Sequence, residues 1–76
     1  MAITYILKSD KDGSYYVGAT RKIEERLLKH GKGEVSSTKS RRPFKLVYYE
    51  NFNSFSEANE REMQIKRWKK RRAIEI

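Results

Sequence analysis

The chain has no cysteine, a single proline and no long apolar run. The absence of cysteine excludes disulfide cross-links, thiolate zinc sites and a cysteine nucleophile, and it fits a reducing compartment. No apolar stretch approaches the ~18 residues that a membrane span needs, and the first residues lack the apolar stretch of a signal peptide. We therefore expect a cytoplasmic protein that has no membrane partner.

Positive charge is present in excess. The 76 residues contain 18 Lys and Arg against 10 Asp and Glu, which gives a formal net charge of +8. Such an excess favours phosphate-bearing partners through charge neutralisation and counterion release. Nucleic acid is the expected partner, with an anionic membrane surface or mere solubility as the alternatives. A chain this short has room for one modest core, so residues 1–76 are expected to form a single domain.

Strand, turn and helix signals predict five elements along the chain. Strands are expected over residues 3–8, 15–19 and 44–52, and helices from about Arg21 to His30 and from Ser54 to about Lys70. The order β-β-α-β-α predicts an α+β fold with a small three-stranded antiparallel sheet flanked by helices. The last residues allow a further short C-terminal helix.

Local signals refine the ends and faces of these elements. Thr20 is the expected N-cap of the first helix and Gly31 the residue that ends it. Ser54 followed by Glu57 is a capping box for the second helix. Simple alternation in the third strand predicts one face for Phe44, Leu46 and Tyr48 and the other for Lys45, Val47 and Tyr49.

Polar side chains fall on the helix faces that should be apolar. In the first helix, Arg26 and His30 share the inward stripe of Ile23 and Leu27, while Leu28 points elsewhere. In the second helix, Glu62 lies within an apolar arc formed by Phe55, Ala58, Ile65 and, more peripherally, Trp68. A carboxylate buried without compensation costs several kcal/mol, so Glu62 needs a cation, a metal ion or a water-filled cleft.

Purely structural roles can also explain why these polar residues lie on apolar helix faces. A Glu62–Arg26 ion pair can bridge the two helices, or Glu62 can reach solvent at a boundary position. His30 near a helix C-terminus can complement the helix dipole. The tyrosines of the predicted hairpin, Tyr5, Tyr15 and Tyr16, can pack across strands. Yet tyrosine, arginine, histidine and glutamate together also cover the needs of phosphodiester cleavage, which are a deprotonated water, a metal ion and a cation for the developing charge.

Five segments appear in an order that matches a known family. They are Ile3-Thr4-Tyr5, Tyr16-Val17-Gly18, Arg26 to His30, Ser40 to Tyr49, and Ser56 to Glu62. Together they resemble the GIY-YIG nuclease superfamily, in particular its small stand-alone members and the N-terminal nuclease domain of the bacterial excision-repair nuclease. One departure is that Ile3 and Thr4 replace the glycine and isoleucine of the first motif.

This resemblance implies a metal-dependent endonuclease that hydrolyses phosphodiester bonds in DNA, branched or damaged DNA included, in repair or recombination. Glu62 would hold one Mg²⁺ or Mn²⁺, and Tyr5 would take the proton of the attacking water, as a phenolate whose pKa is lowered by Arg26 and the metal ion. Arg26 would stabilise the transition state. Tyr16 would hydrogen-bond a phosphate oxygen or the water, His30 would orient the reacting groups or share the proton transfer, and Gly18 would let the substrate backbone approach closely.

Binding is expected to come from cations outside this group. The basic stretch 66–72 and the loop before the third strand supply them, namely Lys39, Arg41, Arg42, Lys66, Arg67, Lys69 and Lys70. A solvated helix end explains the same stretch. No base-reading element is evident, so recognition of the DNA backbone is expected.

Two alternatives to the nuclease stay open. One is a catalytically silent nucleic-acid-binding module on the same fold, and the other is an accessory or RNA-associated basic protein in which the tyrosines only pack. RNA as the bound nucleic acid, a partner protein that supplies substrate targeting, and the oligomeric state are equally open from the sequence.

Overall fold

The sheet and helices follow the predicted order. The computed structural model describes residues 1–36 and 38–70, apart from the side chains of Lys69 and Lys70. Within that part of the chain, the elements are β1 (Ala2–Ser9), β2 (Tyr15–Thr20), α1 (Ile23–Lys32), a short 3-10 turn (Lys39–Arg41), β3 (Phe44–Phe52) and α2 (Phe55–Lys70). The strands form one antiparallel sheet in the order β2-β1-β3. The α+β prediction is confirmed, whereas the further C-terminal helix lies outside the described residues.

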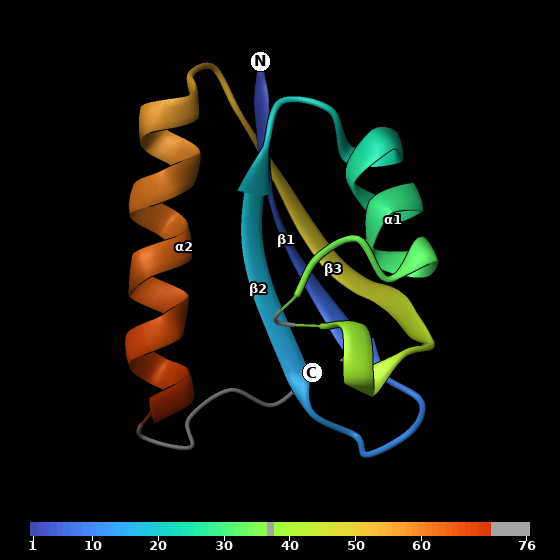
Figure 1. The fold of residues 1–76 in the computed structure, drawn as a ribbon. Coiled ribbons are helices and arrows are strands. Elements are labelled where there is room, and N and C mark those ends of the chain that lie inside the picture. The colour runs from blue at the N-terminus through green and yellow to red at the C-terminus, as the bar shows by residue number, and fades with distance from the viewer. Residues whose placement is uncertain (37, 71–76) are drawn as a thin grey trace.

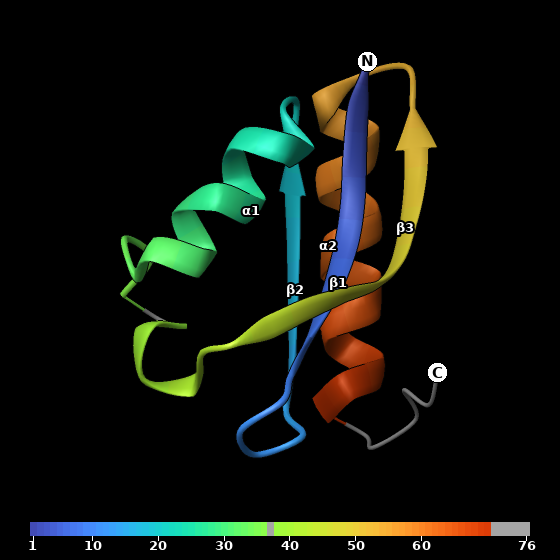
Figure 2. The same ribbon diagram turned by 90° about the vertical axis from the view of Figure 1, so that its right-hand side faces the viewer.

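The two helices lie on opposite sides of the sheet (Figures 1 and 2). Helix α2 packs along the face that carries Ile6 and Val17, which form a buried cluster with Ile65. Thr4 on the same face donates a 2.6 Å hydrogen bond to the carbonyl of Ala58. Because neighbouring strand residues alternate between faces, Tyr5 and its cross-strand partner Gly18 point to the side of α1.

The third strand departs from simple alternation. Tyr48 pairs with Ile6, and Leu46 pairs with Leu7, so Val47 is an extra residue between them. Ile6 and Leu7 point to opposite faces, and their partners Tyr48 and Leu46 therefore do so too. The prediction that Leu46 and Tyr48 share a face is wrong, because a bulge changes the phase of a strand at that point.

The helix ends follow the sequence signals only in part. The capping pair is confirmed, since Ser54 Oγ accepts a hydrogen bond from the Glu57 N–H. In the first helix, Thr20 and Gly31 are not the caps. Thr20 Oγ1 accepts from the Lys22 N–H before the helix begins, and the helix continues to Lys32. Gly33 ends it with a left-handed φ of 77°, a conformation that favours glycine.

Exposure separates the inward and outward residues of the helices. Ala58 and Ile65 are buried and Leu28 is exposed, as predicted. Phe55 does not join the core, and Trp68 is also exposed, with Arg61 stacked over its ring at 4.8 Å. The apolar arc is therefore buried in its middle, at Ala58 and Ile65, and exposed at both ends.

Candidate active site

Tyr5 lies at the centre of the candidate site. It belongs to the middle strand β1, and its side chain is completely buried. Its hydroxyl lies 3.1 Å from Nε2 of His30, which comes from the last turn of α1. Two residues 25 positions apart in the sequence are thus joined by a buried hydrogen bond. Such a bond orients both side chains.

Gly18 makes room for the Tyr5 hydroxyl. A Cβ atom at this position would lie 2.6 Å from the Tyr5 oxygen and 2.7 Å from Cζ. Gly18 is itself buried. The structure therefore gives this glycine a packing reason, since the space beside it is filled by Tyr5. A contact between Gly18 and a substrate backbone stays a prediction.

We expect Gly18→Ala to destabilise the protein by about 1–3 kcal/mol, because the added methyl group overlaps a buried ring that has no room to move. Gly31→Ala is the matched control. A Cβ at Gly31 meets no atom within 4 Å, and alanine in a helix is favoured over glycine by roughly 0.5–1 kcal/mol. Urea denaturation measures both changes, and equal stability of Gly18→Ala and the parent would contradict the packing role.

His30 is held on both sides of its ring. It is only 1% exposed, and its Nδ1 lies 2.8 Å from Oγ1 of Thr38. The ring of Tyr16 stands edge-on to it with a centroid distance of 4.9 Å. Phe44 approaches from β3 at 6.3 Å. His30 is therefore a fixed part of the site rather than an exposed cation at a helix end.

Tyr16 lines the same side of the sheet, and Tyr15 does not. Tyr16 is half-buried, and its ring centroid lies 6.3 Å from that of Tyr5. Tyr15 faces the opposite side, where it packs against the Ile6–Val17–Ile65 cluster. The cluster of three tyrosines seen in the sequence thus separates into two site residues and one core residue.

Burial determines the protonation of the Tyr5–His30 pair. Burial raises the pKa of Tyr5 to about 12, the charge of Tyr16 adds to the rise, and hydrogen bonding and charge from Arg26 oppose it. Burial and the charge of Arg26 lower the pKa of His30 below its usual value of 6.5. In the protein without a metal ion, desolvation outweighs Arg26, so Arg26 alone does not lower the pKa of Tyr5. A lowered pKa with the metal ion bound stays a prediction. At neutral pH the phenol is protonated and the imidazole is neutral.

Glu62 approaches the site from α2, in the other layer. Its side chain is 17% exposed and forms an ion pair with Lys66 one turn along the helix. Its negative charge contributes to the raised pKa of Tyr5, which places the carboxylate within electrostatic reach of the phenol. Among the described residues, no ion pair joins Glu62 to Arg26. The bridging role considered for Glu62 from the sequence is therefore not what the structure contains.

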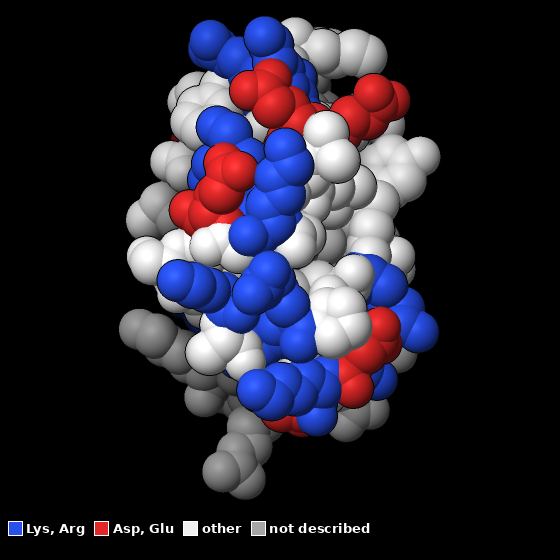
Figure 3. All heavy atoms as spheres, turned by 45° about the vertical axis from the view of Figure 1, so that its right-hand side comes forward, with Lys and Arg blue, Asp and Glu red and all other residues white. Residues whose placement is uncertain are grey.

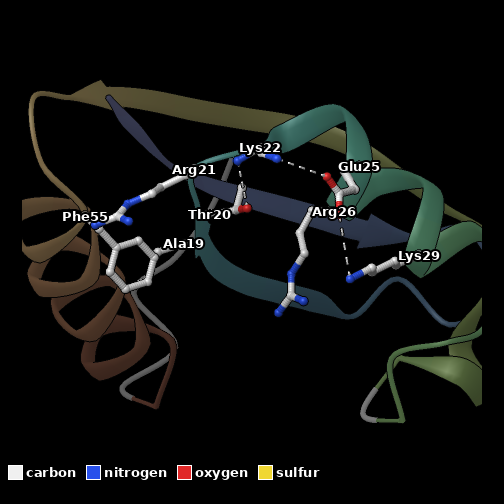
Figure 4. A pocket seen from close by; sticks show the side chains of 8 residues that line it. All are labelled: Ala19, Thr20, Arg21, Lys22, Glu25, Arg26, Lys29 and Phe55. Carbon is white, nitrogen blue, oxygen red and sulfur yellow. Dashed lines mark hydrogen bonds and ion pairs between the residues drawn. The ribbon is translucent and has the colours of Figure 1, made fainter.

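Arg26 points into a surface groove of ≈ 490 Å³ between α1, the end of β2 and the start of α2 (Figure 4). The groove is lined by Ala19, Thr20, Arg21, Lys22, Glu25, Arg26, Lys29 and Phe55. Glu25 lies within 3.9 Å of Lys22 and 4.0 Å of Lys29, which leaves Arg26 without an ion-pair partner in the described part of the chain. Arg21 stacks over the ring of Phe55 at 5.6 Å. A guanidinium that no carboxylate neutralises, in an open groove, is suited to binding phosphate.

The sequence indicated Arg26 but not the other groove cations. Arg21, Lys22 and Lys29 lie outside the basic stretches that stood out, and only the fold brings them together. On the side of the molecule that brings α1 forward, Lys and Arg side chains extend from one end to the other, with acidic side chains among them (Figure 3).

Several predicted binding cations have contacts within the chain. Arg42 donates to the carbonyls of Lys39 and Gly31, at 3.0 and 3.3 Å. Arg41 donates to Ser14 Oγ at 3.1 Å and lies over the ring of Phe44. Lys66 is paired with Glu62, whereas Lys39 and Arg67 are exposed. The side chains of Lys69 and Lys70 lie outside the described part. Nucleic-acid binding by this set stays a prediction.

Glu62 is a carboxylate that could hold a metal ion at this site. Within residues 1–36 and 38–70, no three His, Cys, Asp or Glu side chains gather into a metal-binding group. Mg²⁺ nevertheless fits a single partly exposed carboxylate, because it keeps several waters and takes its other ligands from substrate phosphate oxygens. The donor set suits such an ion and does not suit zinc, which needs three or four protein ligands.

The buried Tyr5–His30 pair, with Arg26 and Glu62 nearby, forms the candidate site of this α+β fold, and similarity to known proteins gives its family. Residues 1–75 match the family model described as the GIY-YIG catalytic domain, and the chain belongs to this family of nuclease domains, whose members are generally metal-dependent. It is 44% identical over 73 residues to a UPF0213 protein of Staphylococcus saprophyticus, covering 95% of this chain and 88% of the relative. A UPF0213 protein of Staphylococcus haemolyticus is 42% identical with the same coverage.

A solved structure has the same fold. The solution NMR structure of a UPF0213 protein from Bacillus halodurans superimposes with a TM-score of 0.53 at 38% identity, covering 88% of this chain and 72% of that one. In the part of the chain that the structure describes, no helix is long and apolar enough to cross a membrane.

Proposed function

We propose that residues 1–76 form a single metal-dependent endonuclease domain that hydrolyses phosphodiester bonds in DNA. The observation that carries this proposal is the buried Tyr5–His30 hydrogen bond, with the guanidinium of Arg26 beside it. A neutral histidine that contacts a protonated phenol is arranged to receive a proton. If the Tyr5–His30 pair were only structural, it would not need Arg26 nearby. Arg26 lines an open groove and has no carboxylate partner among the described residues.

The side chains divide the reaction between them. As a water oxygen bonds to phosphorus, its proton passes to the Tyr5 oxygen while the Tyr5 proton passes to Nε2 of His30. The bond from phosphorus to the leaving oxygen breaks, and the leaving oxygen takes the electron pair. His30 ends the step as imidazolium. This relay does not require a free phenolate, in keeping with the raised pKa of Tyr5.

Arg26 and Tyr16 bind the phosphate in this scheme. Arg26 donates to the oxygens on which negative charge develops, and such a donor commonly accounts for about 10²–10³-fold in rate. The Tyr16 hydroxyl, half-buried beside Tyr5, hydrogen-bonds a phosphate oxygen or the water. The groove cations attract the DNA backbone without reading its sequence.

Glu62 would hold the metal ion, and Mg²⁺ or Mn²⁺ suits its oxygen donors. When bound, the ion polarises the phosphate and neutralises part of its charge. In the protein without a metal ion, the ammonium group of Lys66 forms an ion pair with the Glu62 carboxylate. Lys66 must therefore release Glu62 for a cation to bind, and its exposed position on α2 lets it do so.

The decisive experiment compares Arg26→Gln with Lys32→Gln in a cleavage assay. Pure protein is incubated with Mg²⁺ or Mn²⁺ and with plasmid, branched, damaged or single-stranded DNA, and with RNA. We expect Arg26→Gln to cut about 10²-fold more slowly or worse, because it removes a donor to the developing charge. Lys32 is exposed at the end of the same helix and does not line the groove, so Lys32→Gln is expected to cut like the parent.

Equal rates for the two variants would contradict the role of Arg26. A chelator is expected to stop cleavage. If no substrate is cut but binding weakens steeply with salt, the chain acts as a nucleic-acid-binding module on this fold, because counterion release needs only the groove cations. If neither cutting nor salt-dependent binding is seen, the tyrosines only pack and the nuclease proposal fails.

A further inference from the structure

Thr38 is the one buried residue in a polar stretch whose described neighbours, Ser36 and Lys39, are exposed. Its side chain is completely inaccessible to solvent. Its Oγ1 lies 2.8 Å from His30 Nδ1 and donates to the Val35 carbonyl at 3.3 Å. A buried hydroxyl between a carbonyl and a histidine ring constrains which ring nitrogen carries the proton.

At Tyr5, the surroundings determine which atom donates the hydrogen bond between Tyr5 and His30 and which accepts it. The guanidinium of Arg26 lies within electrostatic reach of Tyr5 and can only donate. It therefore offers no acceptor to the Tyr5 proton, which needs one elsewhere. In the described part of the chain, the hydrogen bond of the Tyr5 hydroxyl is made with one side chain, that of His30. His30 Nε2, 3.1 Å away, is the acceptor, and it must be unprotonated.

The contacts of Thr38 indicate the same protonation of the His30 ring. A neutral imidazole with an unprotonated Nε2 carries its hydrogen on Nδ1, and this hydrogen points at Thr38 Oγ1. The threonine proton then goes to the Val35 carbonyl, which can only accept. In this arrangement the Tyr5 hydroxyl, the His30 Nδ1–H and the Thr38 hydroxyl each donate to an acceptor. The opposite tautomer leaves the buried Tyr5 proton without one.

We infer that Thr38 is a positioning residue that holds His30 in the Nδ1–H tautomer, with Nε2 free to receive the proton of Tyr5. The receiving step rests on the proposed nuclease function, whereas the tautomer does not. Thr38 acts through His30, in the way that an outer hydrogen-bond partner fixes the orientation and tautomer of a histidine.

The tautomer is measurable directly, because His30 is the single histidine of the chain. In protein labelled with ¹⁵N, the ring-nitrogen shifts show that one nitrogen is protonated, and the couplings of each nitrogen to Hδ2 and Hε1 identify which one, with no residue assignment needed. The charged and titratable groups that face the ring, Tyr5 from β1, Tyr16 from β2 and Arg26 from α1, are the same in every variant. We expect Nδ1–H in the parent at neutral pH, a shift toward Nε2–H in Thr38→Val, and the parental pattern in Thr38→Ser.

Cleavage is expected to follow the tautomer. Thr38→Val should cut about 10- to 100-fold more slowly, the loss typical of removing an outer partner of a functional histidine, and Thr38→Ser should cut like the parent. A merely structural threonine would lower the stability of Thr38→Val and leave its ring shifts unchanged. An Nε2–H tautomer in the parent, or parental shifts in Thr38→Val, would overturn the inference, and the first of these is measurable even if Thr38→Val does not fold. If His30 of the parent carries its hydrogen on Nδ1 but the parent cuts no nucleic acid, the positioning role of Thr38 is supported and the nuclease proposal is refuted.

Discussion

Replacing Tyr5 with phenylalanine is expected to lower the cleavage rate by about 10²–10⁴-fold, the usual contribution of a positioned proton-transfer group. The change removes the oxygen that passes the water proton to His30 and leaves the ring that fills the space beside Gly18. Loss of one buried hydrogen bond leaves the His30 Nε2 unpaired, which costs about 1–3 kcal/mol of stability. The variant should therefore stay folded at room temperature and bind DNA with the salt dependence of the parent.

Tyr49→Phe is the matched control for this prediction. Tyr49 lies directly opposite Tyr5 on the neighbouring strand, and it undergoes the same loss of one hydroxyl. Its side chain is 55% exposed, so the change should leave both stability and cleavage unaltered. Parental cleavage by Tyr5→Phe would remove Tyr5 from the mechanism. Cleavage lost equally in both variants would indicate a general effect of removing a tyrosine hydroxyl from the sheet, whereas a contaminating nuclease would keep cutting in both.

The fold was predictable from the sequence where short-range signals decide it. The strand over residues 44–52 and the Ser54–Glu57 cap depend on neighbours a few residues apart, and both were predicted correctly. The phase of β3 was not, because the bulge at Val47 arises from pairing with β1, about forty residues away in the chain. Likewise, the sequence signal predicted Gly31 as the end of the first helix, and the backbone conformation shows that Gly33 is the end.

The site was predictable as an inventory of residues but not as an arrangement. Arg26, His30 and Glu62 stood out because each is polar on a helix face that should be apolar. Thr38 gave no signal, since a threonine in a polar loop is ordinary until the fold buries it against His30. The direction of the Tyr5 pKa was also beyond the sequence, because it depends on the balance between burial and Arg26. That balance changes the expected mechanism from a phenolate base to a proton relay.

Replacing Glu62 with glutamine should separate activity from stability most clearly. The carboxylate proposed to hold the metal ion is lost, which removes several kcal/mol of transition-state stabilisation and slows cleavage by about 10²–10⁴-fold. The folded state loses little, because the Glu62–Lys66 pair lies within one helix, and Lys66 is half-exposed. Pairs of this kind contribute only about 0.3–0.5 kcal/mol.

The stability measurement distinguishes this role from the bridge that the sequence also allowed. Breaking a buried ion pair between two helices costs about 3–5 kcal/mol, so a loss of that size in Glu62→Gln would show that the carboxylate is structural. Glu60→Gln, an exposed change on the same helix, supplies the control for charge and helix propensity. Binding of Mn²⁺ to the free protein, followed by calorimetry, should weaken in Glu62→Gln and not in Glu60→Gln. A carboxylate that is dispensable for folding yet required for both metal binding and cleavage is held at this position for the chemistry.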